Sequence, residues 1–366
     1  MTIILFFVIL LVLVLVHEFG HFIVAKKNGI KVEEFGFGFP PRLWSIKKGE
    51  TRYSFNALPF GGFVKILGEN GLEKIPIEDF NRSMTSKKKW VQASVLLAGV
   101  FANFLLAWIL FSITLFFASP LVMDSIPLEA KERMSTRQLI VLSVLENGPA
   151  FNAGIKEGDV ILSLETSKEK IINPIVTDFI SFVNHPEENI HISYLRNKKE
   201  MSADIIPKVD ESLGRAIIGI SPITLFSGKF NFFESINYGF QTTILTTRDT
   251  LISFGKLISG GSEGKMVRDS VVGPVGLVGI IGIITHVGFG YLISFVGLIS
   301  LSLAVINLLP FPALDGGRVL FIVIEKIKGT PIKPKVAGII NMIGFALLII
   351  LMIVVTYRDI TRLITP

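Results

Sequence analysis

The stretch IILFFVILLVLVLV at residues 3–16, followed at once by HEFGH at residues 17–21, decides the fold class of this chain. The first part contains only Ile, Leu, Phe and Val. With the turns that follow, as far as Ala25, it is long enough to cross a hydrocarbon core of about 30 Å at about 1.5 Å per helical residue. A signal peptide fits less well, because the segment lacks a basic start and a small-residue cleavage site and ends in ionisable side chains. We therefore predict a first transmembrane helix here.

The composition of the whole chain supports a membrane protein. Of 366 residues, 50% are hydrophobic and 18% are charged, whereas soluble domains carry about 25% charged residues. Further apolar runs predict a second, a third and a fourth span at residues 91–119, 288–309 and 336–356. The chain has no cysteine, so a metal site would have to use His, Asp or Glu in place of thiolates.

The distribution of charge predicts the orientation in the membrane. The net charge of +6 comes from basic residues at 26–90 and 326–335, beside the apolar runs, while residues 119–290 carry a small acidic excess. Cytoplasmic loops of membrane proteins show this bias toward Lys and Arg. We therefore predict that both termini and the long insert between the second and third spans lie outside the cytoplasm. The same distribution argues against nucleic acid as a partner.

The insert has the pattern of a small α+β domain. Residues 140–145, 159–164, 189–196 and 201–206 look like strands, and residues 149–154 look like a short helix. The predicted parts of the chain are an N-terminal membrane core at 1–124 with spans one and two, an extracytoplasmic domain at 125–210, an amphipathic or interfacial linker at 211–285, and a C-terminal membrane core at 286–366 with spans three and four.

Three segments outside the four spans are predicted to enter the membrane or to lie at its surface, with alternatives for each. Residues 33–66 alternate like strands, with a turn and a further strand predicted at Pro59–Val64. Such a sheet can enter a bilayer only where protein or water satisfies its backbone, and a cytoplasmic hairpin is the alternative. Residues 230–258 predict an amphipathic helix, either on the outer membrane surface or against the inserted domain. The apolar run that begins at Gly273 has about 14 residues and favours a re-entrant or interfacial helix.

The motif at the end of the first span places ionisable side chains where they are costly. His17 and His21 are four residues apart and share one helical face, where two imidazoles can bind one metal with the Glu18 carboxylate beside them. Three such residues next to a hydrocarbon run need a partner or a metal. On this motif alone, a proton relay or a transporter site remains an alternative.

A hydrolytic zinc site has three protein ligands and one open position, so the two histidines need a third ligand. Asp315 is the best candidate, because the stretch NLLPFPALDGG at residues 307–317 places it after helix-breaking prolines at the inner end of the third span. Counted along antiparallel spans at about 1.5 Å per residue, the two motifs reach a similar depth. His185, His191 and His286 are predicted to be structural or surface residues.

Together, HExxH at residues 17–21 and NxxPxPxLDG at residues 307–316 resemble the site-2 protease family of intramembrane zinc metalloproteases. The four spans, the segment Gly61-Gly62-Phe63 and the inserted domain resemble its bacterial regulator of sigma-E protease branch. Residues 144–161 are similar to a PDZ domain. The chain has room for one such domain, whereas the sigma-E protease of enteric bacteria carries two in tandem.

This resemblance implies a zinc site and a location. His17, His21 and Asp315 would bind Zn²⁺, and Glu18 would be the catalytic base. The protein would lie in a bacterial cytoplasmic membrane, with its active site toward the cytoplasm. The expected fold is a polytopic α-helical membrane protein with four transmembrane helices, a membrane-associated β-hairpin or sheet and one inserted α+β PDZ domain.

The expected activity is hydrolysis of peptide bonds within or near the transmembrane segments of single-span proteins. By resemblance, the substrates are anti-sigma factors or remnant signal peptides, met in the lipid bilayer. A substrate helix must unwind before it is cut, and the unwound segment could add as a strand to the sheet. Gly61, Gly62, Phe63 and Val64 are the predicted substrate-binding residues.

Other roles are less defined by the sequence. Asn307 is predicted to hold the substrate backbone or the developing oxyanion, or else to cap the helix end. The PDZ groove is expected to bind a peptide C-terminus or to exclude bulky ectodomains. A catalytically silent PDZ scaffold and a metal or proton transporter are the alternative functions.

Overall fold

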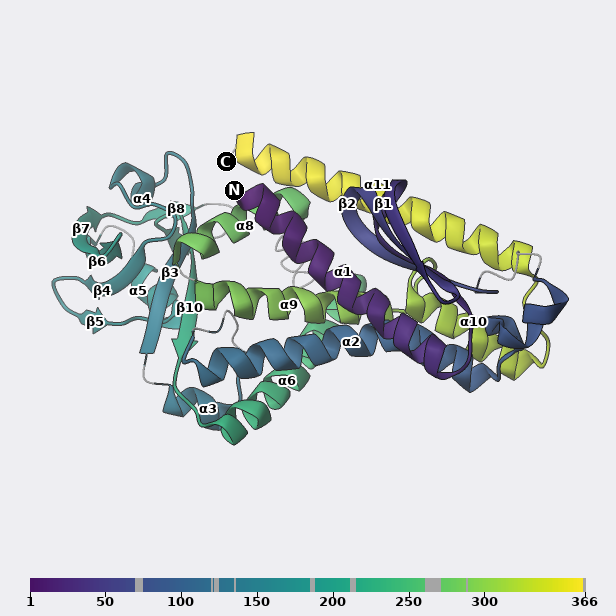
Figure 1. The fold of residues 1–366 in the computed structure, drawn as a ribbon. Helices are drawn as coiled ribbons and strands as arrows, with labels where there is room; N and C mark the ends of the chain where they lie inside the picture. The colour runs from purple at the N-terminus through teal and green to yellow at the C-terminus, as the bar shows by residue number, and fades with distance from the viewer. Residues whose placement is uncertain are drawn as a thin grey trace. The chain divides into compact units, whose positions relative to one another are not determined.

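The computed structural model of the chain (Figure 1) describes residues 1–69, 75–119, 121, 125–134, 136–184, 188–210, 215–260, 271–287 and 289–364. The fold has four helices that are long and apolar enough to cross a membrane among these residues. They are α1 (Thr2–Lys27), α2 (Lys89–Phe116), α9 (Phe289–Leu308) and α11 (Pro334–Ile364). The four predicted spans are therefore confirmed, and the chain is a multi-pass membrane protein.

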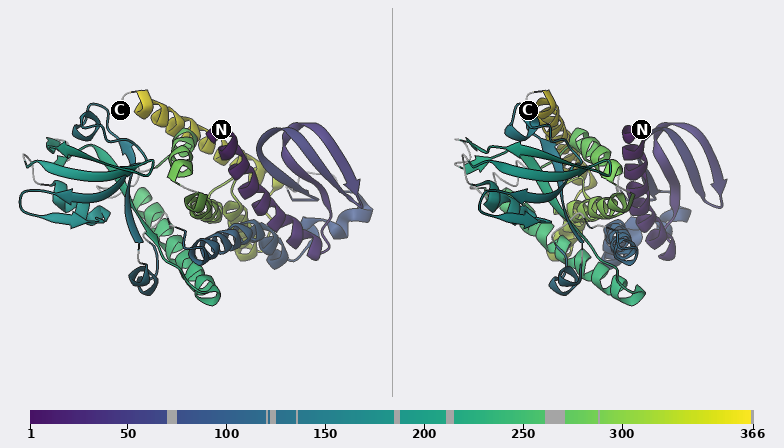
Figure 2. Two further views of the ribbon diagram at one scale, coloured as in Figure 1. Left: turned by 60° about the vertical axis from the view of Figure 1, so that its left-hand side comes forward. Right: turned by 90° about the vertical axis from the view of Figure 1, so that its left-hand side faces the viewer.

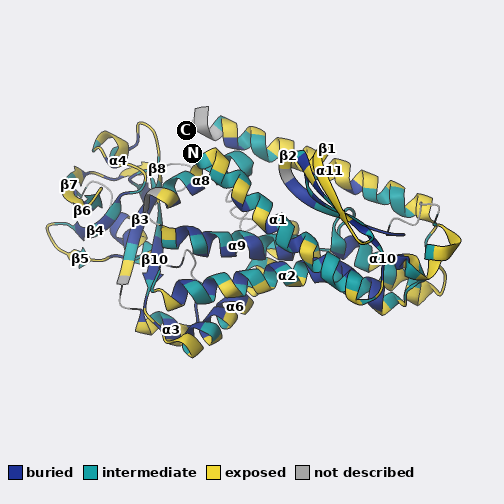
Figure 3. Cartoon of the chain, viewed as in Figure 1, coloured by how far each residue is buried: buried dark blue, intermediate teal, exposed yellow. Residues whose placement is uncertain are grey.

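The sequence explains where these helices begin and end. The helix α1 ends before Gly29, which has the left-handed φ of 64° that glycine adopts without strain. The helix α9 ends at Leu308, because Pro310 cannot continue a helical hydrogen-bond ladder. Along α11 most side chains are exposed (Figure 3), and they are almost all apolar, as expected for a helix that faces lipid.

Two compact units divide the chain. One contains Met1–Trp108, Thr247–Gly273 and Val296–Tyr357, and the other contains Ile109–Thr246, Pro274–Phe295 and Arg358–Pro366. In the first unit, α1 and α2 approach closely, because a Cβ on Gly20 would collide with the Ala98 backbone. The Ser300 hydroxyl of α9 donates a hydrogen bond of 2.9 Å to the Asn103 carbonyl of α2. Small side chains and interhelical hydrogen bonds are the usual means of packing helices in membranes.

A two-stranded sheet of β1 (Val32–Lys48) and β2 (Thr51–Ile66) packs against α1. The strands are joined at Lys48 and Thr51, and Val32 lies opposite Ile66 at the far end. Between these ends, residues 34–37 lie opposite both 52–55 and 62–65. The chain therefore reverses its direction within β2, and residues 62–65 lie on the second edge of β1; the sheet is strongly curved (Figure 2).

The register agrees with the turn and the further strand predicted at Pro59–Val64. Residues 52–55 run in the same direction as residues 34–37, whereas residues 62–65 run in the opposite direction, so the chain turns between these two parts of β2. Proline and glycine are the usual signals of such a turn. Beyond β2, two short 3-10 helices, η1 (Ile77–Arg82) and η2 (Met84–Ser86), lead to α2. The helix α10 (Asp315–Lys328) ends at Gly329, which has φ 74°.

The second unit contains the PDZ-type domain. Its main sheet has the strand order β10-β3-β4-β6-β7, with β5 paired to β4, and the helices α4 and α5 accompany it. The core is apolar and includes Leu139, Ile161, Phe179, Ile192 and Tyr194. The elements are β3 (Thr136–Val144), α4 (Pro149–Asn152), β4 (Val160–Glu165), β5 (Lys170–Ile172), α5 (Val176–Val183), β6 (Ile190–Arg196), β7 (Lys199–Ile205) and β10 (Ile220–Ser227), with a separate hairpin of β8 (Lys208–Asp210) and β9 (Arg215–Ile217).

The strands and the short helix predicted in the insert agree with β3, α4, β4, β6 and β7. The strand β10 lies outside the range 125–210 that the sequence suggested for this domain, although it pairs with β3 along its whole length. A strand that completes a sheet from a distance leaves no local signal of the sheet to which it belongs.

Three further helices precede or follow these elements in the sequence. They are α3 (Leu128–Arg133), α6 (Phe232–Ser259) and α8 (Pro274–Val287). The helix α6 agrees with the helix predicted at 230–258. In its first half, polar and small residues such as Ser235 and Thr242 are buried, while Phe232, Phe233 and Phe240 are exposed. The helix α8 has 14 residues, about 21 Å of helix, which is short for a span. Whether it lies at the interface stays a prediction.

Candidate metal centre

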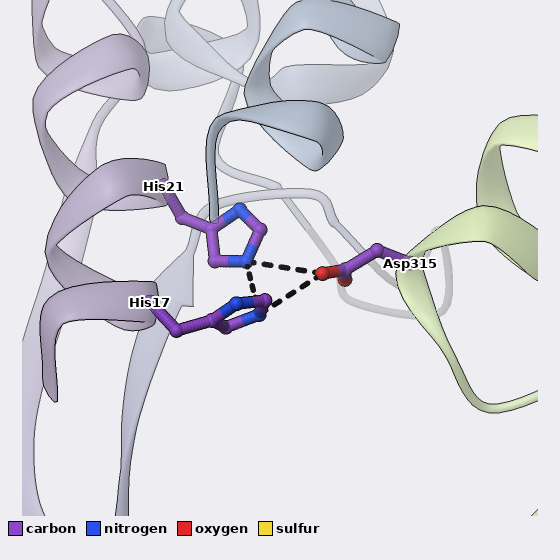
Figure 4. Close-up of side chains that lie close together, drawn as sticks. All are labelled: His17, His21 and Asp315. Carbon is purple, nitrogen blue, oxygen red and sulfur yellow. Dashed lines mark hydrogen bonds and ion pairs between the residues drawn. The ribbon is translucent and has the colours of Figure 1, made fainter. Parts of the chain in front are cut away.

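Three side chains converge from α1 and α10 (Figure 4). His17 and His21 project from consecutive turns of α1, and Asp315 is the first residue of α10. The two Nε2 atoms lie 3.1 Å apart. Asp315 Oδ2 lies 3.0 Å from His17 Nε2 and 3.3 Å from His21 Nε2. The structure thus brings together two motifs that are almost 300 residues apart in the sequence, as the depth argument predicted.

The spacing of these three atoms fits a zinc ion. Ligands at about 2.0–2.2 Å from zinc in a tetrahedral site lie roughly 3.3–3.6 Å from one another. The three observed separations, from 3.0 to 3.3 Å, are close to that edge length. The His21 Nδ1 atom lies 2.7 Å from the Val95 carbonyl. Because a carbonyl can only accept, Nδ1 carries the proton and Nε2 presents its lone pair to the cluster.

Among the described residues, neither Lys nor Arg belongs to the cluster. Asp315 Oδ2 is buried and has no hydrogen-bond partner beyond the two imidazoles, and His17 Nδ1 is also buried without a partner, among the described residues. A carboxylate oxygen and a lone-pair nitrogen repel each other at 3 Å unless a proton or a metal lies between them. The donor set of two imidazoles and one carboxylate is one that zinc takes in hydrolytic sites.

The helix α2 supports the histidine pair from behind. Its Val95 carbonyl orients the His21 ring, and Gly99 one turn later faces both rings. A Cβ on Gly99 would lie 2.7 Å from His17 Cε1 and even closer to His21 Nε2. Only glycine therefore lets α2 approach the pair so closely. The sequence interpretation missed both residues. A backbone carbonyl leaves no signal in a sequence, but a glycine in an apolar span does suggest close packing.

The loop before α10 fixes Asp315. Ala313 adopts φ 75°, a left-handed conformation that is strained for a residue with a Cβ. Its N–H donates to Asn341 Oδ1 of α11 at 3.2 Å. Gly316 and Gly317 allow the first turn of α10 to approach the carbonyls of Leu308 and Phe311. Sequence analysis also missed Asn341, because nothing in its neighbourhood links it to a loop 28 residues away.

Glu18 lies beside the sheet. It is half-buried on α1, next to His17. At the bend of β2, a Cβ on Gly62 would lie 3.9 Å from Glu18 Cγ and 3.3 Å from Leu15 Cδ2. The structure therefore places Gly62 beside Glu18. Gly61 is buried next to Val14.

The other predicted residues lie elsewhere. Phe63 stacks with Phe39 on the sheet, and Val64 packs on an apolar cluster that includes Ile66 and Val95. Asn307 lies half-buried in the last turn of α9, and its role stays a prediction.

The remaining histidines do not join the cluster in the part of the chain that the structure describes. His191 is on β6, with its Nδ1 atom 2.9 Å from Asp204 Oδ1 on the domain surface. His185 lies outside the described residues. His286 belongs to α8, and its side chain is not among those described.

Comparison with known proteins agrees with this geometry. Residues 5–351 match the family described as peptidase family M50. A Clostridium acetobutylicum protein that carries the name of a zinc metalloprotease is 34% identical over 95% of this chain and 94% of its own length. The regulator of sigma-W protease RasP of Bacillus subtilis is 28% identical over 99% of both chains. The chain therefore belongs to peptidase family M50, the site-2 protease type of intramembrane zinc metalloproteases.

Proposed function

We propose that this protease cuts single-span membrane proteins at the cluster of His17, His21 and Asp315, with Glu18 as the catalytic base. The observation that carries the proposal is the triangle of two Nε2 atoms and one carboxylate oxygen, with sides of 3.0–3.3 Å, next to a glutamate. The three ligands would hold the zinc ion. Zinc supplies Lewis acidity, which makes water a nucleophile near neutral pH and polarises the scissile carbonyl.

Glu18 is suited to move the proton. Glu18 follows His17 in the chain and its Cγ lies beside Gly62, which would bring its carboxylate near both the cluster and the proposed substrate strand. It would accept a proton from the attacking water and then pass that proton to the leaving nitrogen. General acid–base catalysis of this kind contributes about 10²–10⁴-fold to a rate. Asn307 would hold the substrate backbone or the oxyanion.

The strand β2 offers a way to hold an unwound substrate. Residues 62–66 pair with β1 on one edge, and no described strand pairs with their other edge. An extended substrate segment could hydrogen-bond to that edge and thereby replace the bonds that it lost when its helix unwound. Gly61 and Gly62, with no side chains, allow the segment to approach beside Glu18, and Phe63 and Val64 continue the edge.

The orientation and the substrates complete the proposal. Basic residues beside the spans support a position in the bacterial cytoplasmic membrane with the termini and the PDZ-type domain outside and the metal centre toward the cytoplasm. The relative RasP is named as a regulator of sigma-W, which favours anti-sigma factors as substrates, with remnant signal peptides as a second group. The PDZ groove would bind a peptide C-terminus or exclude bulky ectodomains.

The test compares wild type with Glu18→Gln in detergent or liposomes. Both proteins should bind one equivalent of zinc, and only wild type should cut a single-span peptide. The loss expected for Glu18→Gln is about 10²–10⁴-fold. Unchanged cleavage by Glu18→Gln at full zinc occupancy would contradict the role of Glu18. Zinc-dependent transport without any cleavage would favour a transporter, and peptide binding without either activity would favour a PDZ scaffold.

A further inference from the structure

A cavity of about 740 Å³ lies next to the candidate metal centre, within the same compact unit. It is lined by the segment after β2, the start of α2, α10 and the start of α11. Pockets of about 300–1,000 Å³ with apolar walls and a few polar groups are typical of sites that bind ligands. The residues of this cavity have no part in the proposed chemistry.

Two helices lead from the metal centre into the cavity. On α10, Asp315 is followed three and seven residues later by Arg318 and Ile322, which line the cavity on the same helical face. On α2, the residue after Val95 is Leu96, and Leu96 also lines the cavity. Asn341, which holds the loop before Asp315, forms another part of the wall. The cavity is therefore continuous with the elements that position the candidate ligands.

Four charged groups of the wall form two ion pairs, and a fifth, Lys333, is exposed just before the start of α11. Arg318 forms an ion pair with Glu69, and Lys89 forms one with Glu325. Glu325 also accepts a hydrogen bond of 2.8 Å from the Ile332 N–H. Because these four charges already have partners, a ligand gains little from a charge placed beside them. The apolar part of the wall includes Met84, Leu96, Phe321, Ile322 and Ile332. The chemistry of the cavity therefore favours uncharged, apolar groups.

The course of β2 shows how a substrate would reach the cavity. Gly62 lies beside Glu18, and Gly68 and Glu69, shortly after the end of the strand, line the cavity. An extended strand covers about 3.3 Å per residue, so the four steps from Gly62 to the end of β2 at Ile66 cover about 13 Å. A substrate strand that pairs with β2 from Gly62 to Ile66 would therefore present its next side chains to the cavity.

We propose that this cavity is a specificity site that takes apolar substrate side chains about four to six residues from the scissile bond, on the side where β2 ends at Ile66. The proposal rests on the proposed function, because it needs a substrate strand along β2. A retained phospholipid is the competing occupant. The continuity of the cavity with β2 and with the loop that carries Asp315 favours the peptide.

Crosslinking tests the occupant directly, because the chain has no cysteine of its own. In a Glu18→Gln background, which would hold substrate uncut, we would introduce Ala337→Cys in the cavity wall and, in a separate protein, Ile339→Cys. Ile339 is on the same helix but does not line the cavity, and 54% of its surface is exposed. Each protein is oxidised with single-span peptides that carry one cysteine at successive positions on either side of the cleavage site.

The expected result is a disulfide from Ala337→Cys to peptide positions about four to six residues from the cut on one side only. Ile339→Cys should react with no position above background. A third protein, Lys65→Cys on the exposed edge of β2, reports strand addition separately. A crosslink to Lys65→Cys without one to Ala337→Cys overturns the specificity site and leaves strand addition standing. Equal yields at Ala337→Cys and Ile339→Cys also overturn it.

A second experiment places a larger side chain in the cavity and measures how the preference among substrates changes. Ala337→Phe would fill part of the space, and Ile339→Phe is its control. Wild type should prefer peptides with Leu over Ala at the cavity positions by about tenfold in kcat/KM, which is the size of discrimination that apolar pockets provide. In Ala337→Phe the ratio of kcat/KM for the Leu and Ala peptides should fall to about one, whereas Ile339→Phe should keep the ratio of wild type. An unchanged preference, or a phospholipid that copurifies with wild type but not with Ala337→Phe, overturns the proposal.

Discussion

Two buried aspartates, one in each compact unit, have opposite surroundings. In the PDZ-type domain, Asp159 is buried, and its two oxygens accept hydrogen bonds of 2.7 Å from Arg196 and one of 2.8 Å from the Lys156 N–H. In the membrane core, the ionisable neighbours of Asp315 among the described residues are the two imidazoles of His17 and His21. Both carboxylates lie where an unpaired charge would be costly.

The difference separates a structural carboxylate from a functional one. Asp159 has a cation supplied by the chain, so its pairing is complete when the domain folds. Asp315 has lone-pair donors around it and lacks a cation among the described residues within the cluster. Burial alone therefore does not identify a site. A buried acid whose neighbours are themselves metal ligands indicates an external cation.

The sharpest test of this comparison is Asp315→Asn, which keeps the shape of the side chain and removes its charge. Even outer-shell partners of metal ligands are worth about 10–100-fold in affinity, so loss of a ligand should lower zinc affinity by at least about 100-fold and abolish cleavage. The structure around it should remain folded. Zinc titration, peptide cleavage and circular dichroism check these outcomes. Full zinc affinity in Asp315→Asn would show that the third ligand is another group.

The reciprocal test is Arg196→Met, which leaves Asp159 buried without its cation. Removal of one partner of a buried ion pair costs about 3–5 kcal/mol, so the domain should become much less stable. Hydrogen exchange of the β3 and β4 amides should speed up, while zinc binding is unchanged. The control is Lys170→Met, since the pair of Lys170 and Glu165 is largely exposed and such pairs contribute at most about 1 kcal/mol. Equal effects of the two variants would refute the distinction.

Most of the membrane core could be predicted from the sequence. Long apolar runs and a HExxH motif are local signals, and counting residues along antiparallel spans was enough to bring Asp315 to the depth of His17. The geometry of the cluster agrees with that reasoning.

The parts that the sequence did not predict depend on partners far along the chain. The pairing of the last part of β2 with the second edge of β1 and the pairing of β10 with β3 are set by tertiary contacts. The Val95 carbonyl and the Asn341 side chain act on the site from other helices, and neither belongs to a motif. Spacing rules find ligands within one element, whereas these supporting contacts are found only in the folded chain.

A more moderate effect is expected from Gly99→Ala, which tests how the membrane core positions its ligands. The new methyl group would collide with the His21 ring and displace it. We expect about a tenfold loss of zinc affinity, the lower end of the range for outer-shell changes. The matched control is Gly255→Ala on α6, where no atom lies within 4 Å of the new Cβ and the helix should gain about 0.5–1 kcal/mol. Zinc affinity that is unchanged in both variants would mean that the ring adapts freely.

The smallest effect is expected for a third carboxylate, that of Glu50 in the turn between β1 and β2. Glu50 forms ion pairs with two cations, and both pairs are partly exposed to solvent. Lys26 donates to it at 2.7 Å and Arg82 binds its other oxygen. The bond from Lys26 lowers the pKa of Glu50 below its ordinary value of 4.5, so the folded state favours the ionised form. The contribution of this carboxylate to stability is therefore complete above pH 4.5 and is lost as the pH falls through the lowered pKa.

Glu50→Gln should destabilise the sheet by less than about 1 kcal/mol at pH 7. Hydrogen exchange of the strand amides should then no longer differ between wild type and variant at a pH well below the lowered pKa. Glu50→Gln and Arg196→Met should therefore differ in the free energy of unfolding that they cost. Equal losses would show that exposure to solvent does not explain the difference between the two ion pairs.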